Sequence, residues 1–336
     1  MIKRLTSLLP DFLVIVTLFS CASAAAAQAP GTFIPTGNMT TPRTHHTATL
    51  LLNGKVLITG GTDPTRPGSY SASASAELFD PNTGTFTATG NMTTRHVSGS
   101  ATLLADGRVL ITGGNVVDDG TGAFTNLWSV AELYDPSTGT FTATGNMVRP
   151  QAGNTSTLLN SGKVLISGTC QDWFDIDADA EGDRPELYDP VTGTFSAAGA
   201  KKTRWCSGPV ILLANGQVLV AGTAELYDPG NDTFNPTGRR MTYGFYGSTA
   251  TLLPNGRVLV VGGTGDFGTP PNGEVYDPST GQFTAAENMI RARAWGHTAT
   301  LLSDGTVLTA ISHRWESENR FFRDSTGDFS TDALLG

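Results

Sequence analysis

Short apolar segments with alternating polarity recur along the chain, and they predict β-strands rather than long helices. In one copy, residues 47–51 read Thr-Ala-Thr-Leu-Leu, a turn follows at Asn53-Gly54, and residues 55–61 read Lys-Val-Leu-Ile-Thr-Gly-Gly. An Asn-Gly pair between two apolar runs is typical of a tight β-hairpin. The Gly-Gly pair at the strand end is typical of a close backbone approach and of a positive φ.

This hairpin begins a unit of four strands, which we name A to D in chain order. In the second copy, strand C spans residues 131–136, a turn follows at 137–139, and Phe141 leads strand D. Because apolar residues alternate along these strands, each small sheet must cover both of its faces. Neighbouring copies can do this by packing face to face around an axis. The unit recurs six times, with its A–B turn glycine at Gly54, Gly107, Gly162, Gly216, Gly256 and Gly305.

The sequence therefore predicts an all-β fold, a six-bladed β-propeller with four antiparallel strands per blade. A D-like segment at 31–39 precedes the first blade and is expected to close the ring. The last blade departs from the pattern, because residues 320–324 stand where its strand C is expected. Both Phe33 and Phe329 compete for its outer strand, and the sequence leaves that choice open. The expected blades are residues 40–89, 90–144, 145–198, 199–237, 238–286 and 287–333.

The unit resembles the kelch repeat, which carries Arg-x-x-His, a double glycine, Tyr-Asp-Pro and a later aromatic residue. In the first copy these stand at Arg43 to His46, Gly60-Gly61, Phe79-Asp80-Pro81 and Phe86, and the resemblance covers residues 31–330. It implies a propeller, and it implies no single function, since kelch propellers include binding modules and enzymes.

Two enzyme groups share this resemblance. The galactose-oxidase group holds copper with a Tyr-His pair and further Tyr and His ligands. No tyrosine here is followed by histidine, and the chain has no room for the additional domains of those oxidases, so copper is not expected. A six-bladed exported kelch protein also resembles the sialic-acid mutarotase type, whose Arg-rich mouth handles an acidic sugar.

Composition and charge narrow the partners. The chain has 336 residues, a formal net charge of −9 and a pI near 5.0. That balance argues against nucleic acid and acidic membranes as partners, because a protein that binds them needs a basic face.

Residues 1–27 are typical of a signal peptide, with Lys3 and Arg4 ahead of an apolar run and small residues at the cleavage site. We expect an exported monomer without a transmembrane span, and Cys21 in an imperfect lipobox offers an alternative lipid anchor.

The connections divide into two groups by the end of the blade at which they lie. The A–B and C–D turns share one end, the turn face, and are uniformly short. The B–C and D–A connections share the other end, the loop face, and vary widely in length, which is typical of a recognition surface. The loop face collects the candidate ligand residues: Arg43, His46, Arg95, Arg149, Trp173, Arg204, Trp205, Tyr243, Tyr246, Arg293, Trp295 and His297.

Each kind of candidate allows two interpretations. In the first interpretation the arginines bond between blades to repeated glutamates, such as Glu77 and Glu132, or to loop carbonyls. In the second they form a ring for an anionic ligand. The aromatic rings either stack on sugars or pack the loops. His46 and His297 share one repeat position in neighbouring blades, which suits a two-His metal site or a structural role.

The third B–C loop carries Asp175, Asp177 and Asp179, whose alternation resembles the start of a calcium loop, against the alternative of a solvated acidic loop. Cys170 and Cys206 are expected on the loop face of adjacent blades, and export favours a disulfide between them.

The sequence lacks a Gly-x-Ser-x-Gly elbow, a phosphate loop and a His-Glu-x-x-His motif. We therefore expect an exported binding module that recognises a carbohydrate or protein ligand on the loop face, rather than an enzyme. The alternatives are an enzyme acting on an acidic sugar and a purely structural surface protein.

Overall fold

The computed structural model describes residues 35–63, 72–114, 129–149, 154–167, 185–202, 208–238, 247–263, 273–287, 289 and 297–310. Residues 117–118, 124–125 and 332–334 are described as strands only. The chain divides into two compact units, residues 1–35 and 36–336, and every strand belongs to the second unit.

The second unit consists of repeated antiparallel sheets, which we call blades. Five have four strands, and in each the strands pair in chain order as a meander. Blade one contains β1 (Thr47–Leu50), β2 (Val56–Thr59), β3 (Ala76–Asp80) and β4 (Thr85–Ala88); blade two contains β5 (Ser100–Leu103), β6 (Val109–Thr112), β9 (Ala131–Asp135) and β10 (Thr140–Ala143). Blade three contains β11 (Thr155–Leu158), β12 (Val164–Ser167), β13 (Glu186–Asp189) and β14 (Thr194–Ala197).

Blade four contains β15 (Val210–Leu212), β16 (Val218–Val220), β17 (Glu225–Asp228) and β18 (Thr233–Pro236); blade five contains β19 (Thr249–Leu252), β20 (Val258–Val261), β21 (Gly273–Asp277) and β22 (Gln282–Ala285). A three-stranded sheet, blade six, contains β23 (Thr298–Leu301), β24 (Val307–Ala310) and β25 (Asp332–Leu334). A small hairpin of β7 (Val117–Asp118) and β8 (Phe124–Thr125) lies between β6 and β9.

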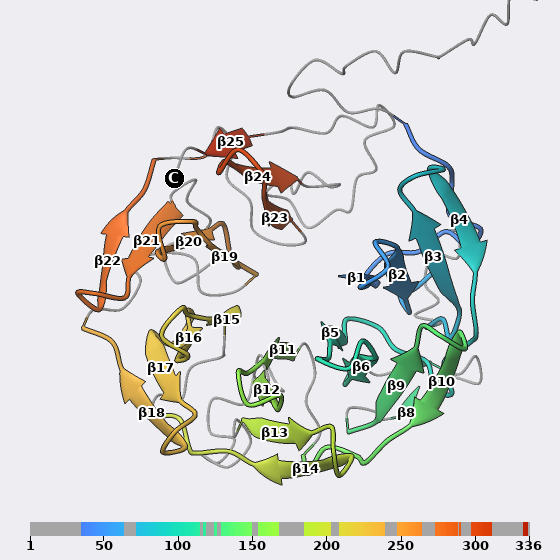
Figure 1. Cartoon of the computed structure of the whole chain (residues 1–336), viewed down its shortest axis with the longest axis horizontal. Helices are drawn as coiled ribbons and strands as arrows, with labels where there is room; N and C mark the ends of the chain where they lie inside the picture. Colours follow the sequence, from blue (N-terminus) through green and yellow to red (C-terminus); the bar gives the residue numbers. More distant parts are fainter. Residues whose placement is uncertain are drawn as a thin grey trace, which may run out of the picture. The chain divides into compact units, whose positions relative to one another are not determined.

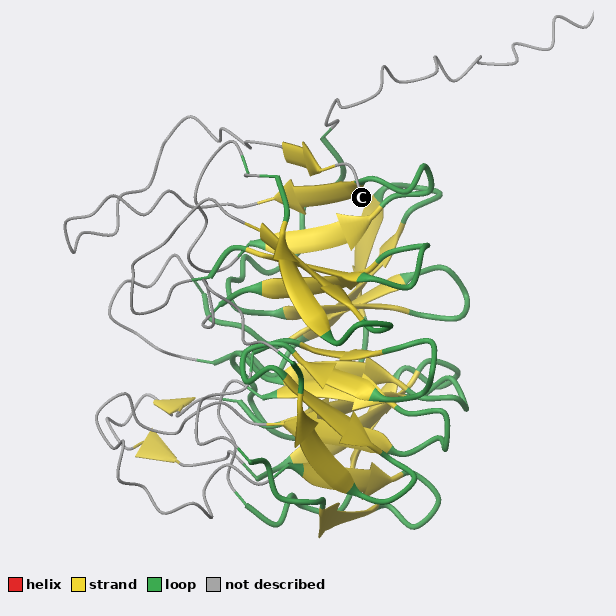
Figure 2. Cartoon of the chain, turned by 90° about the vertical axis from the view of Figure 1, so that its left-hand side faces the viewer, coloured by secondary structure: helices red, strands yellow, loops and turns green. Residues whose placement is uncertain are grey.

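The blades are set side by side with their first strands innermost (Figure 1). Each first strand contacts the first strand of the next blade, in succession from β1 through β5, β11, β15 and β19 to β23. Seen from the side, the short turns gather at one end of the sheets, and the β7–β8 hairpin lies at the other (Figure 2). Repeated four-stranded antiparallel sheets arranged in this way are consistent with the predicted propeller.

Apolar clusters between consecutive blades form the core. Between blades one and two, Leu57 packs with Val109, Ile111 and Tyr134, all buried, and four equivalent clusters join the blades up to blade six. Each such side chain contributes about 1.5–3 kcal/mol on burial. The clusters explain why apolar residues alternate along the strands, since each sheet faces a neighbour on both sides.

Polar contacts join the residues that follow a fourth strand to the third strand and the C–D turn of the next blade. The Thr89 hydroxyl lies 2.9 Å from that of Tyr134 in the next blade, and the Gly90 N–H donates to the Gly139 carbonyl at 2.9 Å. The Gly37 N–H makes the same bond to the Gly84 carbonyl at 2.7 Å. The described part of segment 31–39 therefore joins blade one as the corresponding glycines join theirs, and Phe33 lies outside the described residues.

Blade six differs from the expectation. Its third strand is β25, with Val307 opposite Leu334 and Thr309 opposite Asp332. Residues 320–324 and Phe329, on which the sequence-based prediction rests, lie outside the described part of the chain. Among the described residues, no helix is long and apolar enough to cross a membrane.

Candidate functional site

The loop face is built on a repeated contact that we call the glutamate clamp. In blades one to five the glutamate of the third strand is buried. In blades one to four its carboxylate accepts backbone N–H bonds from the segment leading into the first strand of the same blade. A buried carboxylate needs such donors, because burial without hydrogen bonds is costly. The clamps are Thr40 (2.7 Å) and Thr41 (3.1 Å) on Glu77, Thr93 (2.6 Å) and Thr94 (2.8 Å) on Glu132, Val148 and Arg149 (both 2.8 Å) on Glu186, and Lys202 (2.6 Å) on Glu225.

Arg43 completes the clamp of blade one. Its side chain is fully buried, and one Nη2 bond of 2.7 Å reaches Glu77. The remaining donors reach the Thr41, Gly60 and Ser75 carbonyls and the Ser75 hydroxyl, at 2.9–3.3 Å. A guanidinium has five N–H donors, and all five are used here. Arg43 therefore joins elements of its own blade rather than two blades, and it has no donor left for a ligand.

His96 takes the same place in blade two, which the sequence reasoning missed. It is buried, its Nε2 lies 3.0 Å from Glu132 Oε1 and 2.8 Å from the Thr94 hydroxyl, and its Nδ1 lies 2.6 Å from the Gly113 carbonyl. Alignment on Met39 and Met92 would have found it, since Arg43 and His96 each follow their methionine by four residues.

The clamps change the acidity of their carboxyl groups. Burial opposes ionisation of Glu132, but the hydrogen bonds from His96, Thr94 and Thr93 outweigh it and lower the pKa of Glu132 to about 2. Burial likewise opposes ionisation of Glu77, and the bonds from Thr40, Arg43 and Thr41 lower its pKa. Both groups are therefore held as carboxylates that anchor the loop face.

The other described arginines lie outside this position. Arg95 precedes His96, its side chain is exposed, and it forms no hydrogen bond or ion pair within the described residues. Arg149 gives its backbone N–H to Glu186, and its side chain is half-buried. The two arginines therefore differ. All N–H donors of the Arg43 side chain bond within the protein, whereas Arg95 faces solvent on the loop face.

His46 and His297 immediately precede β1 and β23, as their shared repeat position predicts. His46 is exposed, and partial desolvation together with the charge of Arg43 lowers its pKa. His297 is buried, with Nε2 3.1 Å from the Val261 carbonyl and 3.3 Å from the Thr249 hydroxyl in blade five. Within the described ranges, no group of three or more His, Cys, Asp or Glu side chains could hold a metal ion.

The remaining candidates lie outside the described residues. They are Trp173, Arg204, Trp205, Tyr243, Tyr246, Arg293 and Trp295, the acidic residues Asp175, Asp177 and Asp179, and Cys170 and Cys206. The calcium loop, the disulfide and the aromatic stacking residues therefore stay predictions.

Comparison with known proteins supports the fold. No family model matches the chain, and no curated protein matches it. Among solved structures, the chain is similar to a fungal alcohol oxidase of the AA5 family in complex with copper, with a TM-score of 0.51 and 18% identity over 86% of this chain and 74% of that one. This likeness confirms the kelch-type, galactose-oxidase-like resemblance at the level of the fold.

The described side chains do not fit a copper site of the tyrosine and histidine kind. The described histidines lie in the segments leading into first strands, on the loop face. The described tyrosines, Tyr134, Tyr188, Tyr227 and Tyr276, each stand next to last in a third strand, beside the turn face. Copper needs its ligands around one point, and these two sets lie at opposite ends of the sheets.

Proposed function

We propose that this protein is an exported binding module whose loop face recognises an anionic carbohydrate or an acidic protein surface. It is further proposed to form a closed, six-bladed ring. The six repeats and the succession of first strands from β1 to β23 support the ring. The signal-like residues 1–27 support export.

The observation that carries the proposal is the contrast between Arg43 and Arg95. The architectural position in blades one and two is filled by Arg43 and His96, whose polar atoms are committed to the clamp and nearby carbonyls. Arg95 takes no part in the clamp, and its side chain is exposed on the loop face, which carries the long connections. An exposed guanidinium on a rigid frame suits bidentate recognition of a carboxylate.

Among the described residues, the pKa shifts of buried glutamates and tyrosines favour binding over catalysis. The fold lowers the pKa of the clamp carboxyls Glu77 and Glu132, which moves them away from neutrality. Burial, followed by the hydrogen bond and charge of Asp232, raises the pKa of Tyr227, and burial with the charge of Asp277 raises that of Tyr276. A general acid or base works best with a pKa near the working pH. The shifts found here move the pKa values of these groups further from neutral pH.

The proposal is tested by screening the mature protein on a glycan array that includes uronic and sialic acids. We expect selective retention of acidic glycans, and loss of that retention in Arg95→Ala with an unchanged melting temperature. Retention of neutral glycans alone, or of none, would contradict an anionic carbohydrate as the ligand.

Arg43→Ala serves as the matched architectural variant. It removes the charged partner of the buried Glu77 carboxylate, which keeps only its two backbone N–H donors, and it removes the guanidinium donor of the buried Gly60 carbonyl. We therefore expect a loss of about 3 kcal/mol or more in unfolding free energy. Chemical denaturation measures this loss. Equal stability of Arg43→Ala and Arg95→Ala would contradict the distinct roles assigned to the two arginines.

A further inference from the structure

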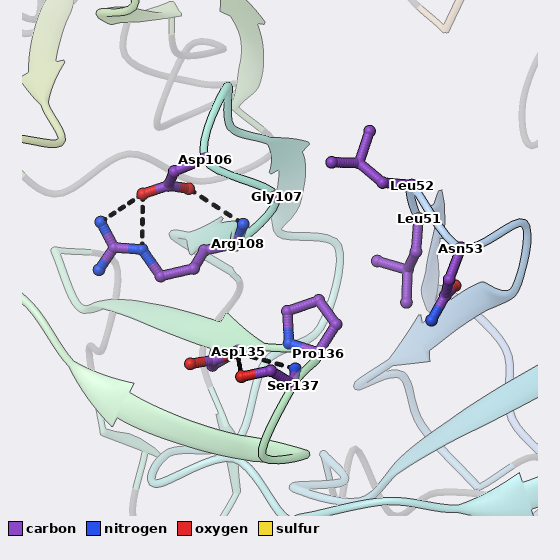
Figure 3. Close-up of a pocket in the computed structure, with 9 residues that line it drawn as sticks. All are labelled: Leu51, Leu52, Asn53, Asp106, Gly107, Arg108, Asp135, Pro136 and Ser137. Atoms are coloured by element: carbon purple, nitrogen blue, oxygen red, sulfur yellow. Dashed lines mark hydrogen bonds and ion pairs between the residues drawn. The ribbon is translucent and has the colours of Figure 1, made fainter.

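A groove on the turn face, opposite the proposed ligand face, carries chemistry of its own. It lies between blades one and two and has a volume of about 460 Å³. Three turns line it: the β1–β2 turn with Leu51, Leu52 and Asn53, the β5–β6 turn with Asp106 to Arg108, and the β9–β10 turn with Asp135 to Ser137 (Figure 3).

The charges of this groove depart from the repeat. In blades one, three and five, the basic residue after the A–B turn pairs with the aspartate of the C–D turn: Lys55 with Asp80 (3.4 Å), Lys163 with Asp189 (3.5 Å) and Arg257 with Asp277 (3.0 Å). In blade two, Arg108 instead binds Asp106 of its own turn, through Nη2 at 2.7 Å and Nε at 2.8 Å. This second bond fixes the guanidinium beside Asp106, as Figure 3 shows.

Asp135 is therefore left without an ion pair among the described residues. Its Oδ1 accepts the Ser137 hydroxyl at 2.6 Å and the Ser137 N–H at 2.8 Å. These bonds, with the Thr138 N–H and the charge of Arg108, lower the pKa of Asp135, but no cation lies within ion-pair distance of its carboxylate in the described part of the chain. Asp135 is half-buried beside Pro136 at the wall of the groove. With Asp106, Arg108 and Asp135 present, the groove has a net charge of −1.

The facing wall is apolar. Leu52 is 76% exposed, although it packs over the next turn, where a Cβ on Gly107 would lie 3.1 Å from Leu52 Cδ1. Because Gly107 has no side chain, Leu52 can occupy the space beside it. The residues at the same turn position in the other blades are smaller, polar or cyclic: Ala105, Asn160, Ala214, Pro254 and Ser303. Blade four has Gln217 in place of a basic residue, but the neighbouring turn offers Asn160 rather than a leucine.

We propose that this groove is a binding site for a segment of a partner protein in which a lysine or arginine stands next to an apolar side chain. The cation would pair with Oδ2 of Asp135, in the place that a basic residue of the same blade takes in blades one, three and five. The apolar neighbour would cover Leu52 and Pro136, removing an exposed leucine from water. This site is separate from the loop face and needs no ligand there.

The test measures fluorescence anisotropy of two capped peptides carrying an uncharged dye, Gly-Leu-Lys-Leu-Gly and Gly-Leu-Glu-Leu-Gly, with the full chain. We expect the lysine peptide to bind and the glutamate peptide not to. Asp135→Asn and Leu52→Ser should each weaken binding by about fivefold or more, and added salt should weaken it further.

Asp189→Asn is the matched control, because it changes the same turn position in blade three, where Lys163 already pairs with the carboxylate. It should leave peptide binding unchanged, and it reports any general effect of altering this turn. Equal binding of the two peptides, no binding of either, or the same loss in Asp189→Asn as in Asp135→Asn would overturn the proposal.

Discussion

At the scale of single residues, the loop face depends on buried glutamate carboxylates that need hydrogen-bond donors. A buried glutamate must find donors, and backbone N–H groups supply some of them in every described clamp. Arg43 adds a guanidinium in blade one and His96 an imidazole in blade two. The sequence indicated that arginines and glutamates would meet between blades; Arg43 and Glu77 do meet, but within blade one. It missed the backbone donors, because an N–H has no residue type for a pattern to reveal.

The pH dependence of stability follows from Glu132. Its pKa is lowered to about 2 in the folded chain, from an ordinary value of 4.5. A lowered folded-state pKa contributes stability that is present above the unfolded pKa and is lost as pH falls through the folded pKa. We therefore expect part of the unfolding free energy to disappear between about pH 4.5 and about pH 2.

The matched variant is Glu132→Gln, which keeps the shape and removes the charge. Its unfolding free energy should start lower at neutral pH and fall less steeply between about pH 4.5 and about pH 2 than that of the unchanged chain. Urea denaturation at a series of pH values measures both slopes. Parallel pH profiles would show that Glu132 carries none of the acid sensitivity.

At the scale of elements, the turns and strand ends could be read from the sequence with little error. The A–B turn glycines have φ values of 80–88°, which glycine adopts without strain. The double glycine was expected to permit a positive φ and a close approach, and both hold: Gly60 and Gly61 have φ values of 69° and 91°, and the Gly61 N–H donates to the His96 carbonyl at 2.9 Å. The sequence around Gly61 could not predict which residue of the next blade it would approach, because that contact depends on how the two blades pack.

Two alanine substitutions separate these effects. At Gly54 an added Cβ meets nothing within 4 Å, so Gly54→Ala should cost only the backbone strain of a left-handed residue, about 1 kcal/mol. At Gly60 the added Cβ would overlap the His96 carbonyl oxygen, so Gly60→Ala should cost at least about twice as much. Chemical denaturation of both variants measures the difference. Equal losses would mean that blades one and two are not in close contact at Gly60.

At the scale of the whole molecule, the repeat determines the architecture and the departures from it mark the surfaces that differ. Five copies form four-stranded sheets, and their strands follow the predicted order. Blade six has Ile311-Ser312 where blades one, two and five have a glycine pair and blades three and four have a glycine followed by threonine. Its pattern therefore no longer specifies one pairing, and its described third strand is β25. The loop face was predicted from loop length. The turn-face groove was not predicted, because its charge depends on Arg108 pairing with Asp106 rather than with Asp135.

Titration calorimetry with an acidic glycan retained on the array tests most directly whether the two ends of the molecule have separate roles. The unchanged chain, Arg95→Ala on the loop face and Asp135→Asn on the turn face are compared at one salt concentration. We predict that Arg95→Ala weakens glycan affinity by about tenfold, as expected for loss of a charged hydrogen bond, and that Asp135→Asn leaves it unchanged. Unchanged affinity in Arg95→Ala, or a loss confined to Asp135→Asn, would contradict a loop-face site for anionic ligands.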